Sequence, residues 1–207
     1  MEKSREKLEI NKSANSQTRK SKKNSGDTIV ELTMAALYTA VLCIFAPHTL
    51  YLPISPIGIT LGSFFVYLTG LMLGSRLGCI SICLYLCMGC VGLPVFSGYV
   101  AGAGVLLGPT GGFLLGYLPC VAVVGAFVGK EKGKKGNALF LAGMIAGTLV
   151  LYVVGLLWFC FFYMEQASFS EAVAVCVLSF LPFDAVKIAL AAVLYKPFMR
   201  LKYRHLK

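Results

Sequence analysis

The sequence predicts an all-α polytopic membrane protein with six transmembrane helices. The 207 residues have a mean hydropathy of +0.78, and 57% of them are hydrophobic while only 14% are charged. Apolar runs follow one another along the chain, and a helix that spans a membrane needs about 20 such residues. The basic residues fall in alternate connections between these runs, as the positive-inside rule requires of a polytopic protein.

Six apolar runs define the expected helices. We place them at about Ile29–Ala46, Ile59–Leu73, Leu77–Val91, Gly112–Val128, Ala138–Tyr163 and Ala172–Tyr195. Pro47 ends the first helix and Pro197 follows the last, because proline lacks the N–H that continues a helix. The second run is short for a full crossing, so we expect it to be extended or tilted.

The basic residues predict that both termini are cytoplasmic. Eight lie in the first 28 residues, one is Arg76, four lie in 130–135, and five lie in the segment from Lys196. The connections at 47–58, 92–111 and 164–171 contain none and should face outward. We therefore expect three parts: a disordered basic tail over 1–28, a membrane domain over 29–196 and a second basic tail over 197–207.

Asp184 and Lys187 are the only charged residues set well inside an apolar run. A charge at bilayer depth costs about 2.5–3.5 kcal/mol on insertion scales, so such residues usually face a cavity or a partner. At a spacing of three residues they share one helix face. A carboxylate only accepts hydrogen bonds and an ammonium only donates them, which suits a small ligand with N–H and C=O groups. The alternative is a structural ion pair that stabilises a helix contact.

The outward segment 92–112 is rich in glycine and carries no charge. Irregular backbone at membrane depth is tolerated only against protein or a cavity, so we expect this segment to fold over a ligand cavity as a lid. Glycine also lets the backbone approach a ligand closely. The Gly-Pro-Thr-Gly-Gly end of the segment lacks the Gly-Lys-Ser/Thr of a phosphate-binding loop, so the chain has no nucleotide motor of its own.

Metal, redox and hydrolytic chemistry find little support in the sequence. Cys87 and Cys90 have CxxC spacing, but no second pair or neighbouring histidine completes a metal site. His48 and His205 lie in no HExxH pattern, and no Gly-x-Ser-x-Gly elbow is present. We predict no catalytic residue, no metal site and no cofactor.

Small residues recur at four-residue spacing in several predicted helices. Such pairs let helices approach closely in lipid, where little hydrophobic force drives association. For most of them we expect packing within the chain, as for Gly70/Gly74, Gly74/Gly78, Gly112/Gly116, Gly125/Gly129 and Gly143/Gly147. Ala36 and Ala40 form the pair that we consider for an external partner.

Three blocks of the sequence resemble a known family. They are Gly92-Leu-Pro-Val-Phe96, Gly104-Val-Leu-Leu-Gly-Pro-Thr-Gly-Gly112 and Pro182-x-Asp184-x-x-Lys187. They are similar to the BioY family, the biotin-specific substrate-binding subunits of energy-coupling factor (ECF) transporters, and the likeness runs from about Thr33 to Tyr195. The resemblance implies a subunit of the bacterial plasma membrane that captures biotin outside the cell. It also implies two kinds of protein partner, a transmembrane coupling subunit and cytoplasmic ATP-binding subunits, and no nucleic acid.

The resemblance also implies roles for individual residues. Asp184 and Lys187 match the polar pair implicated in binding the ureido ring of biotin, and 108–112 matches the motif near the binding cavity. Ala36 and Ala40 match the small-residue motif that contacts the coupling subunit. The predicted substrate-binding residues are Asp184, Lys187, Tyr85, Tyr99, Gly108, Thr110, Gly111 and Gly112.

Two questions stay open at the level of sequence. The long loop has no Arg or Lys for the carboxylate of biotin, so its holders are sought among the loop amides, Ser97, Thr110 and Tyr99. The chain is alternatively a substrate-binding subunit for another vitamin, such as thiamine or riboflavin, or more remotely an intramembrane enzyme or a channel. Ligand selectivity separates the vitamins, an enzyme would need a further acid–base pair or nucleophile, and a channel would conduct ions.

Overall fold

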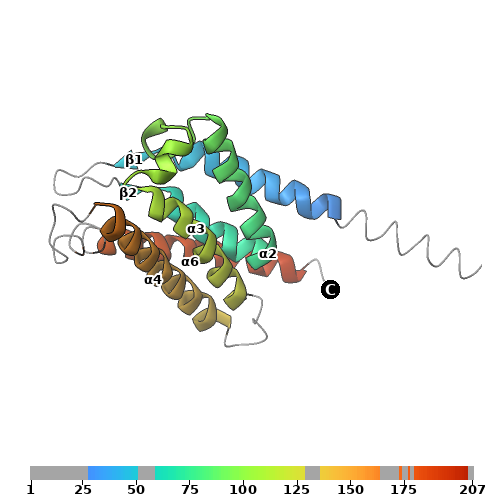
Figure 1. Cartoon of the computed structure of the whole chain (residues 1–207). Coiled ribbons are helices and arrows are strands. Elements are labelled where there is room, and N and C mark those ends of the chain that lie inside the picture. Colours follow the sequence, from blue (N-terminus) through green and yellow to red (C-terminus); the bar gives the residue numbers. More distant parts are fainter. Residues whose placement is uncertain are drawn as a thin grey trace, which may run out of the picture. The chain divides into compact units, whose positions relative to one another are not determined.

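The computed structural model of the chain describes residues 28–50, 59–128, 136–163, 173, 177 and 180–204. Its elements are a helix at Thr28–Phe45, strands β1 (Thr49–Leu50) and β2 (Ile59–Thr60), helix α2 (Gly62–Val91), the 3-10 turns η1 (Ser97–Tyr99) and η2 (Ala103–Leu107), and helices α3 (Gly111–Val128), α4 (Gly136–Tyr163) and α6 (Leu181–Arg204) (Figure 1). By length and composition, four helical segments within these residues can cross a membrane: Thr28–Phe45, Gly62–Val91, Gly111–Val128 and Leu139–Phe162.

The chain divides into two compact units, residues 1–34 and 35–207. The described part of the first unit is the start of the Thr28–Phe45 helix, where Thr33 Oγ1 donates to the carbonyl of Ile29 at 2.8 Å. The second unit contains all the other elements. The predicted first, fourth and fifth helices are confirmed to within two residues at their starts, at Thr28, Gly111 and Gly136.

The two ranges predicted as the second and third helices form a single element, α2, with a break at Gly74. Gly74 has φ 74° and ψ −174°, a conformation that is essentially restricted to glycine. Ser75 Oγ donates to the carbonyl of Ala122 at 2.8 Å and fastens the break to α3. The predicted start at Ile59 was wrong, because Ile59 and Thr60 pair with β1 as an antiparallel ribbon.

Helix α6 does not end before Pro197, as the sequence predicted, but continues to Arg204. Residues 197–204 are therefore helical. Proline removes one backbone hydrogen bond, whereas the residues around it include the good helix formers Lys, Met, Arg and Leu. The predicted start of this helix at Ala172, the tail over 1–27 and the connections at 51–58, 129–135 and 164–172 lie outside the described residues.

Helix α3 packs against both α2 and α4, and α6 contacts α2 and α4 (Figure 1). Glycines allow α2, α3 and α4 to approach one another closely. A Cβ on Gly70 would lie 2.9 Å from Val124, one on Gly78 would lie 2.8 Å from Val121, and one on Gly147 would lie 2.7 Å from Val124. The prediction of packing within the chain is confirmed for these three glycines, whereas a Cβ on Gly74 would meet nothing within 4 Å.

Gly125 provides a test of this packing. A Cβ there would meet the backbone of Gly74 and Ser75, which cannot rotate away. We expect Gly125→Ala to destabilise the protein by about 1–3 kcal/mol, because an overpacked core must shift its backbone. In Gly104→Ala, the matched control, the added Cβ meets nothing within 4 Å. Thermal unfolding in detergent measures both variants, and equal melting temperatures would contradict the close contact at Gly125.

The glycine-rich segment after α2 lies against that helix. Phe96 is fully buried, and its ring lies where a Cβ of Gly89 would otherwise be. Gly102 N–H donates to the carbonyl of Gly89 at 2.8 Å, and Tyr85 OH donates to the carbonyl of Val95 at 3.0 Å. These contacts hold the uncharged segment on the helices close to the start of α3.

Candidate ligand-binding site

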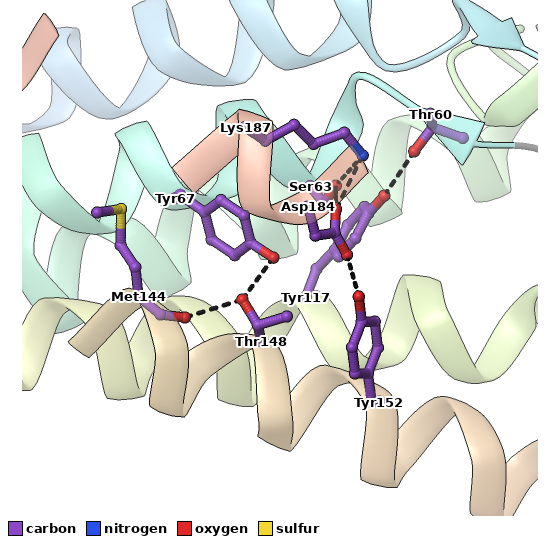
Figure 2. Close-up of polar contacts among 9 residues, drawn as sticks. All are labelled: Thr60, Ser63, Tyr67, Tyr117, Met144, Thr148, Tyr152, Asp184 and Lys187. Atoms are coloured by element: carbon purple, nitrogen blue, oxygen red, sulfur yellow. Dashed lines mark hydrogen bonds and ion pairs between the residues drawn. The ribbon is translucent and has the colours of Figure 1, made fainter. Parts of the chain in front are cut away.

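Asp184 and Lys187 form a buried ion pair on α6. Their exposed fractions are 4% and 7%, and Lys187 Nζ lies 3.0 Å from Asp184 Oδ1. Lys187 also donates to Ser63 Oγ of α2 at 2.8 Å. Tyr152 OH of α4 donates to the second carboxylate oxygen, Asp184 Oδ2, at 2.6 Å (Figure 2). Side chains from three helices therefore converge on one carboxylate.

The pair keeps hydrogen-bonding capacity for a ligand. Among the described residues, Lys187 makes two of the three hydrogen bonds that an ammonium can donate, to Asp184 and to Ser63. Asp184 accepts from Lys187, from Tyr152 and, at the long distance of 3.5 Å, from Ser63. A carboxylate has about four acceptor positions, so at least one remains for a ligand N–H.

Asp184 lines a pocket between the helices and the glycine-rich segment. The lining residues come from β2, α2, η1, α3, α4, α6 and the residues directly before α3 and α6. They are Thr60, Ser63, Ser97, Thr110, Phe113, Leu114, Tyr117, Leu151, Tyr152, Phe180 and Asp184. Aromatic and aliphatic side chains supply the walls, and a few hydroxyls and one carboxylate supply the polar groups. This combination is typical of a small-molecule site.

Two further hydroxyl pairs lie near the ion pair. Tyr117 OH is hydrogen-bonded to Thr60 Oγ1 at 3.2 Å, and both residues line the pocket. Tyr67 OH is hydrogen-bonded to Thr148 Oγ1 at 2.8 Å, and neither of these residues is in the lining (Figure 2). Tyr67 is therefore a buried tyrosine outside the pocket lining whose hydroxyl accepts from Thr148, whereas the Tyr152 hydroxyl donates to a carboxylate.

Through the glycine block 108–112, the loop and the start of α3 pack against Trp158 of α4. Trp158 Nε1–H donates to the carbonyl of Gly108 at 3.1 Å, and a Cβ on Gly112 would meet the Trp158 side chain. A Cβ on Gly111 would meet the backbone of Leu106 in η2. Within this block, Thr110 lines the pocket.

Of the eight predicted ligand contacts, Asp184 and Thr110 line the pocket. The other six do not, and they are Lys187, Tyr85, Tyr99, Gly108, Gly111 and Gly112. Tyr85 is buried, and its hydroxyl holds the carbonyl of Val95 in the loop. Tyr99 is 59% exposed, has the positive φ of 61°, and places its hydroxyl 3.2 Å from His48 Nε2. Thr110 lines the same pocket as Asp184, and Asp184 pairs with Lys187. The hydroxyls of Tyr85 and Tyr99 instead form hydrogen bonds with the Val95 carbonyl and with His48.

Sequence reasoning missed Ser63 and Tyr152, the two hydroxyls that contact the ion pair. The available signal was a hydroxyl within an apolar run. The same pattern also occurs at the buried residues Thr69, Ser81 and Thr148, which do not line the pocket. The spacing along one helix therefore cannot select the hydroxyls that meet Asp184 from another helix.

Ala36 and Ala40 are both exposed on the Thr28–Phe45 helix. The same helix buries Thr39 and Leu42 within the second unit. Thr39 Oγ1 lies 3.0 Å from Ser81 Oγ of α2, which fixes that side of the helix against the bundle. The two small residues therefore remain available to a partner or to lipid.

A pocket with apolar walls among the helices, with an ion pair at its edge, is typical of a small-molecule-binding membrane protein. Residues 15–204 match the sequence profile of the BioY family, and the chain belongs to that family. Relatives include a "Biotin transporter BioY" from Thermotoga maritima, 33% identical over 79% of this chain and 92% of the relative, and a "Probable biotin transporter BioY" from Pyrococcus horikoshii, 34% identical over 79% and 93%. The names of these relatives describe transporters and not enzymes.

A solved structure has the same fold. It is described as the crystal structure of the S-component for biotin from an ECF-type ABC transporter. The match has a TM-score of 0.76 and 27% sequence identity, and it covers 84% of this chain and 93% of that chain. The all-helical membrane fold predicted from the sequence agrees with this match.

Proposed function

We propose that this chain is a biotin-binding membrane subunit, the S component of an ECF-type uptake system. The observation that carries the proposal is the buried pair of Asp184 and Lys187 beside an apolar pocket, in a family whose relatives are named biotin transporters. Biotin is then a transported ligand and not a cofactor. The chain itself binds and releases the ligand, and ATP hydrolysis takes place in other subunits.

The chemistry of the pocket suits the ring system of biotin. The ureido ring offers two N–H donors and one carbonyl acceptor, which Asp184 and the remaining N–H of Lys187 complement. Ser63 and Tyr152 already hold the two carboxylate oxygens, so the acceptor is oriented before the ligand arrives. Phe113 lies beside the sulfur-containing ring in this arrangement, within the apolar part of the lining.

We further propose six membrane crossings with both termini in the cytoplasm, which the positions of the basic residues support. Biotin then enters from outside between the 47–58 and 92–111 connections. In the described part of these connections, Thr49 Oγ1 lies 2.8 Å from Ser97 Oγ, and Gly98 N–H donates to the carbonyl of Pro47 at 3.0 Å. Opening the entrance requires these bonds to break.

The coupling subunit is proposed to dock on the Thr28–Phe45 helix at Ala36 and Ala40. Both residues are exposed, and small side chains let a partner helix approach closely. The cytoplasmic ATP-binding subunits would then tilt the loaded S component and release biotin inward. The localisation that follows is a bacterial plasma membrane.

Calorimetric titration of the detergent-purified chain tests the ligand. We expect saturable, one-to-one binding of biotin and no heat of binding from thiamine or riboflavin. Binding of either other vitamin in place of biotin would instead assign the chain to that vitamin. No binding of any of the three by a folded protein would overturn the proposal.

Tyr152→Phe tests whether the orientation of Asp184 matters for binding. We expect the dissociation constant for biotin to rise roughly tenfold to a hundredfold, because a hydrogen bond to a charged group contributes about 1.5–3 kcal/mol. Tyr67→Phe is the matched control, since it removes a buried hydroxyl that is bonded to Thr148 and does not line the pocket. Equal effects of the two variants on biotin affinity would show that Tyr152 has only a structural role.

A further inference from the structure

The polar groups of the pocket come from two parts of the chain. One set surrounds the ion pair and consists of Asp184, Ser63 and Tyr152. The other set belongs to the glycine-rich segment and consists of Ser97 in η1 and Thr110 directly before α3. Among the lining residues that the structure describes, charge is confined to the first set, and the second set offers hydroxyl groups.

The sequence places the basic residues away from this second set. Between the two termini they are Arg76, Lys187 and the four lysines of 130–135. Lys187 is already paired, and Arg76 follows the break of α2 that lies against Gly125 of α3. Gly125 comes eight residues after Tyr117, the last α3 residue in the lining, which is about 12 Å along a helix. The lysines of 130–135 follow the end of α3, farther along the chain.

Neighbouring groups hold the Ser97 hydroxyl and the backbone of Thr110. Ser97 Oγ lies 2.8 Å from Thr49 Oγ1, which also accepts the Gly98 N–H at 3.0 Å. The carbonyl of Thr110 accepts the Phe113 N–H at 3.1 Å in the first turn of α3. Both hydroxyl-bearing residues are half-buried. The single Thr49 hydroxyl proton serves either Ser97 Oγ or the carbonyl of Pro47, which lies 3.0 Å away. When Thr49 donates to Ser97, the Ser97 proton is free for a ligand, and the Thr110 hydroxyl can donate or accept.

We propose that Ser97 and Thr110 bind the tail end of biotin through these neutral hydroxyls, so that the site also takes biotin derivatives whose carboxylate is neutralised. This inference rests on the proposed biotin function. A hydroxyl donates to a carboxylate and equally donates to, or accepts from, a primary amide. A lysine or arginine at the same place would prefer the anion, because charge-assisted hydrogen bonds are roughly twice as strong as neutral ones. The residues around Asp184 therefore select the ring system of the ligand, and Ser97 and Thr110 bind its tail whether the tail is charged or neutral.

Titration of the full chain with biotin and with biotinamide, its neutral primary amide, tests this inference. We expect the two dissociation constants to agree within about fivefold. No ion pair is lost with the amide, and the stronger bond of a hydroxyl to the carboxylate is offset by the greater cost of desolvating the anion. A preference for biotin of about a hundredfold or more would overturn the inference, since that requires a cation at the tail. Failure of biotin itself to bind would overturn the proposed function and not this inference alone.

A charge introduced at the tail end locates the contact. We expect Thr110→Lys to raise the preference for biotin over biotinamide about tenfold, because the new ammonium pairs with the carboxylate. Ala103→Lys, at an exposed position in η2 outside the lining, should leave the ratio unchanged. An unchanged ratio in Thr110→Lys would overturn the contact at Thr110.

Ser97→Ala serves if the lysine variant does not fold. This variant should weaken the binding of biotin and biotinamide by the same factor, because the hydroxyl serves both tails. A loss confined to biotin, or no loss for either ligand, would overturn the inference.

Discussion

Asp184→Asn is expected to weaken biotin binding by roughly a hundredfold or more. The substitution removes the charged acceptor for the ureido N–H groups and leaves the Lys187 ammonium buried with Ser63. Each hydrogen bond from a ureido N–H to a charged acceptor contributes about 1.5–3 kcal/mol, and each 1.4 kcal/mol is tenfold in affinity. Lys187→Ala should also weaken binding, because Asp184 then keeps only Ser63 and Tyr152. Calorimetry on folded, detergent-purified variants measures both effects.

A double variant separates ligand binding from folding. A buried ion pair can often be replaced by apolar residues at little cost in stability. Asp184→Leu combined with Lys187→Met should therefore give a protein that melts close to the wild type and yet binds no biotin. If this variant bound biotin with wild-type affinity, the pair would be a structural contact and the ligand site would lie elsewhere.

Gly111→Ala is expected to give the second large loss of binding. A Cβ at this position would meet the backbone oxygen and carbon of Leu106 in η2, and backbone atoms cannot rotate away. Relief requires η2 to move from the start of α3, which carries Thr110 and Phe113 of the pocket. We expect biotin affinity to fall by at least about tenfold, because overpacking a close contact costs roughly 1–3 kcal/mol.

Gly104→Ala, in η2 itself, is the matched control for Gly111→Ala. A Cβ on Gly104 meets nothing within 4 Å, so this variant should bind biotin as the wild type does. Titration of both variants under identical conditions makes the comparison. Wild-type affinity in Gly111→Ala would mean that the contact between η2 and the start of α3 does not shape the pocket.

The helices were predictable from the sequence because hydropathy reports the length of an apolar run directly. The starts of α3 and α4 fell within two residues of their predicted positions. The ribbon of Thr49–Leu50 with Ile59–Thr60 was not predictable, since apolar residues next to a helix give no local signal that distinguishes a short strand. The continuation of α6 past Pro197 was missed because proline usually ends a helix but does not always do so.

The candidate site was predictable where the sequence carried a charge, and Thr110 was predicted from the resemblance to the BioY family. Asp184 and Lys187 stood out because a charge inside an apolar run is costly. Ser63 and Tyr152 come from other helices, and only the packing of α2, α4 and α6 brings them to Asp184. Tyr85 was predicted as a ligand contact because aromatic rings suit a bicyclic ligand, but its hydroxyl bonds to the Val95 carbonyl.

An experimental structure of the chain with biotin bound is the most direct test of the central claim. We expect the ureido ring to lie in the pocket, with an N–H of the ring within hydrogen-bonding distance of an Asp184 oxygen. We also expect Tyr152 still to contact that carboxylate. Biotin bound at another place, with the contacts of Asp184 and Lys187 unchanged, would show that the pair is not the ligand site.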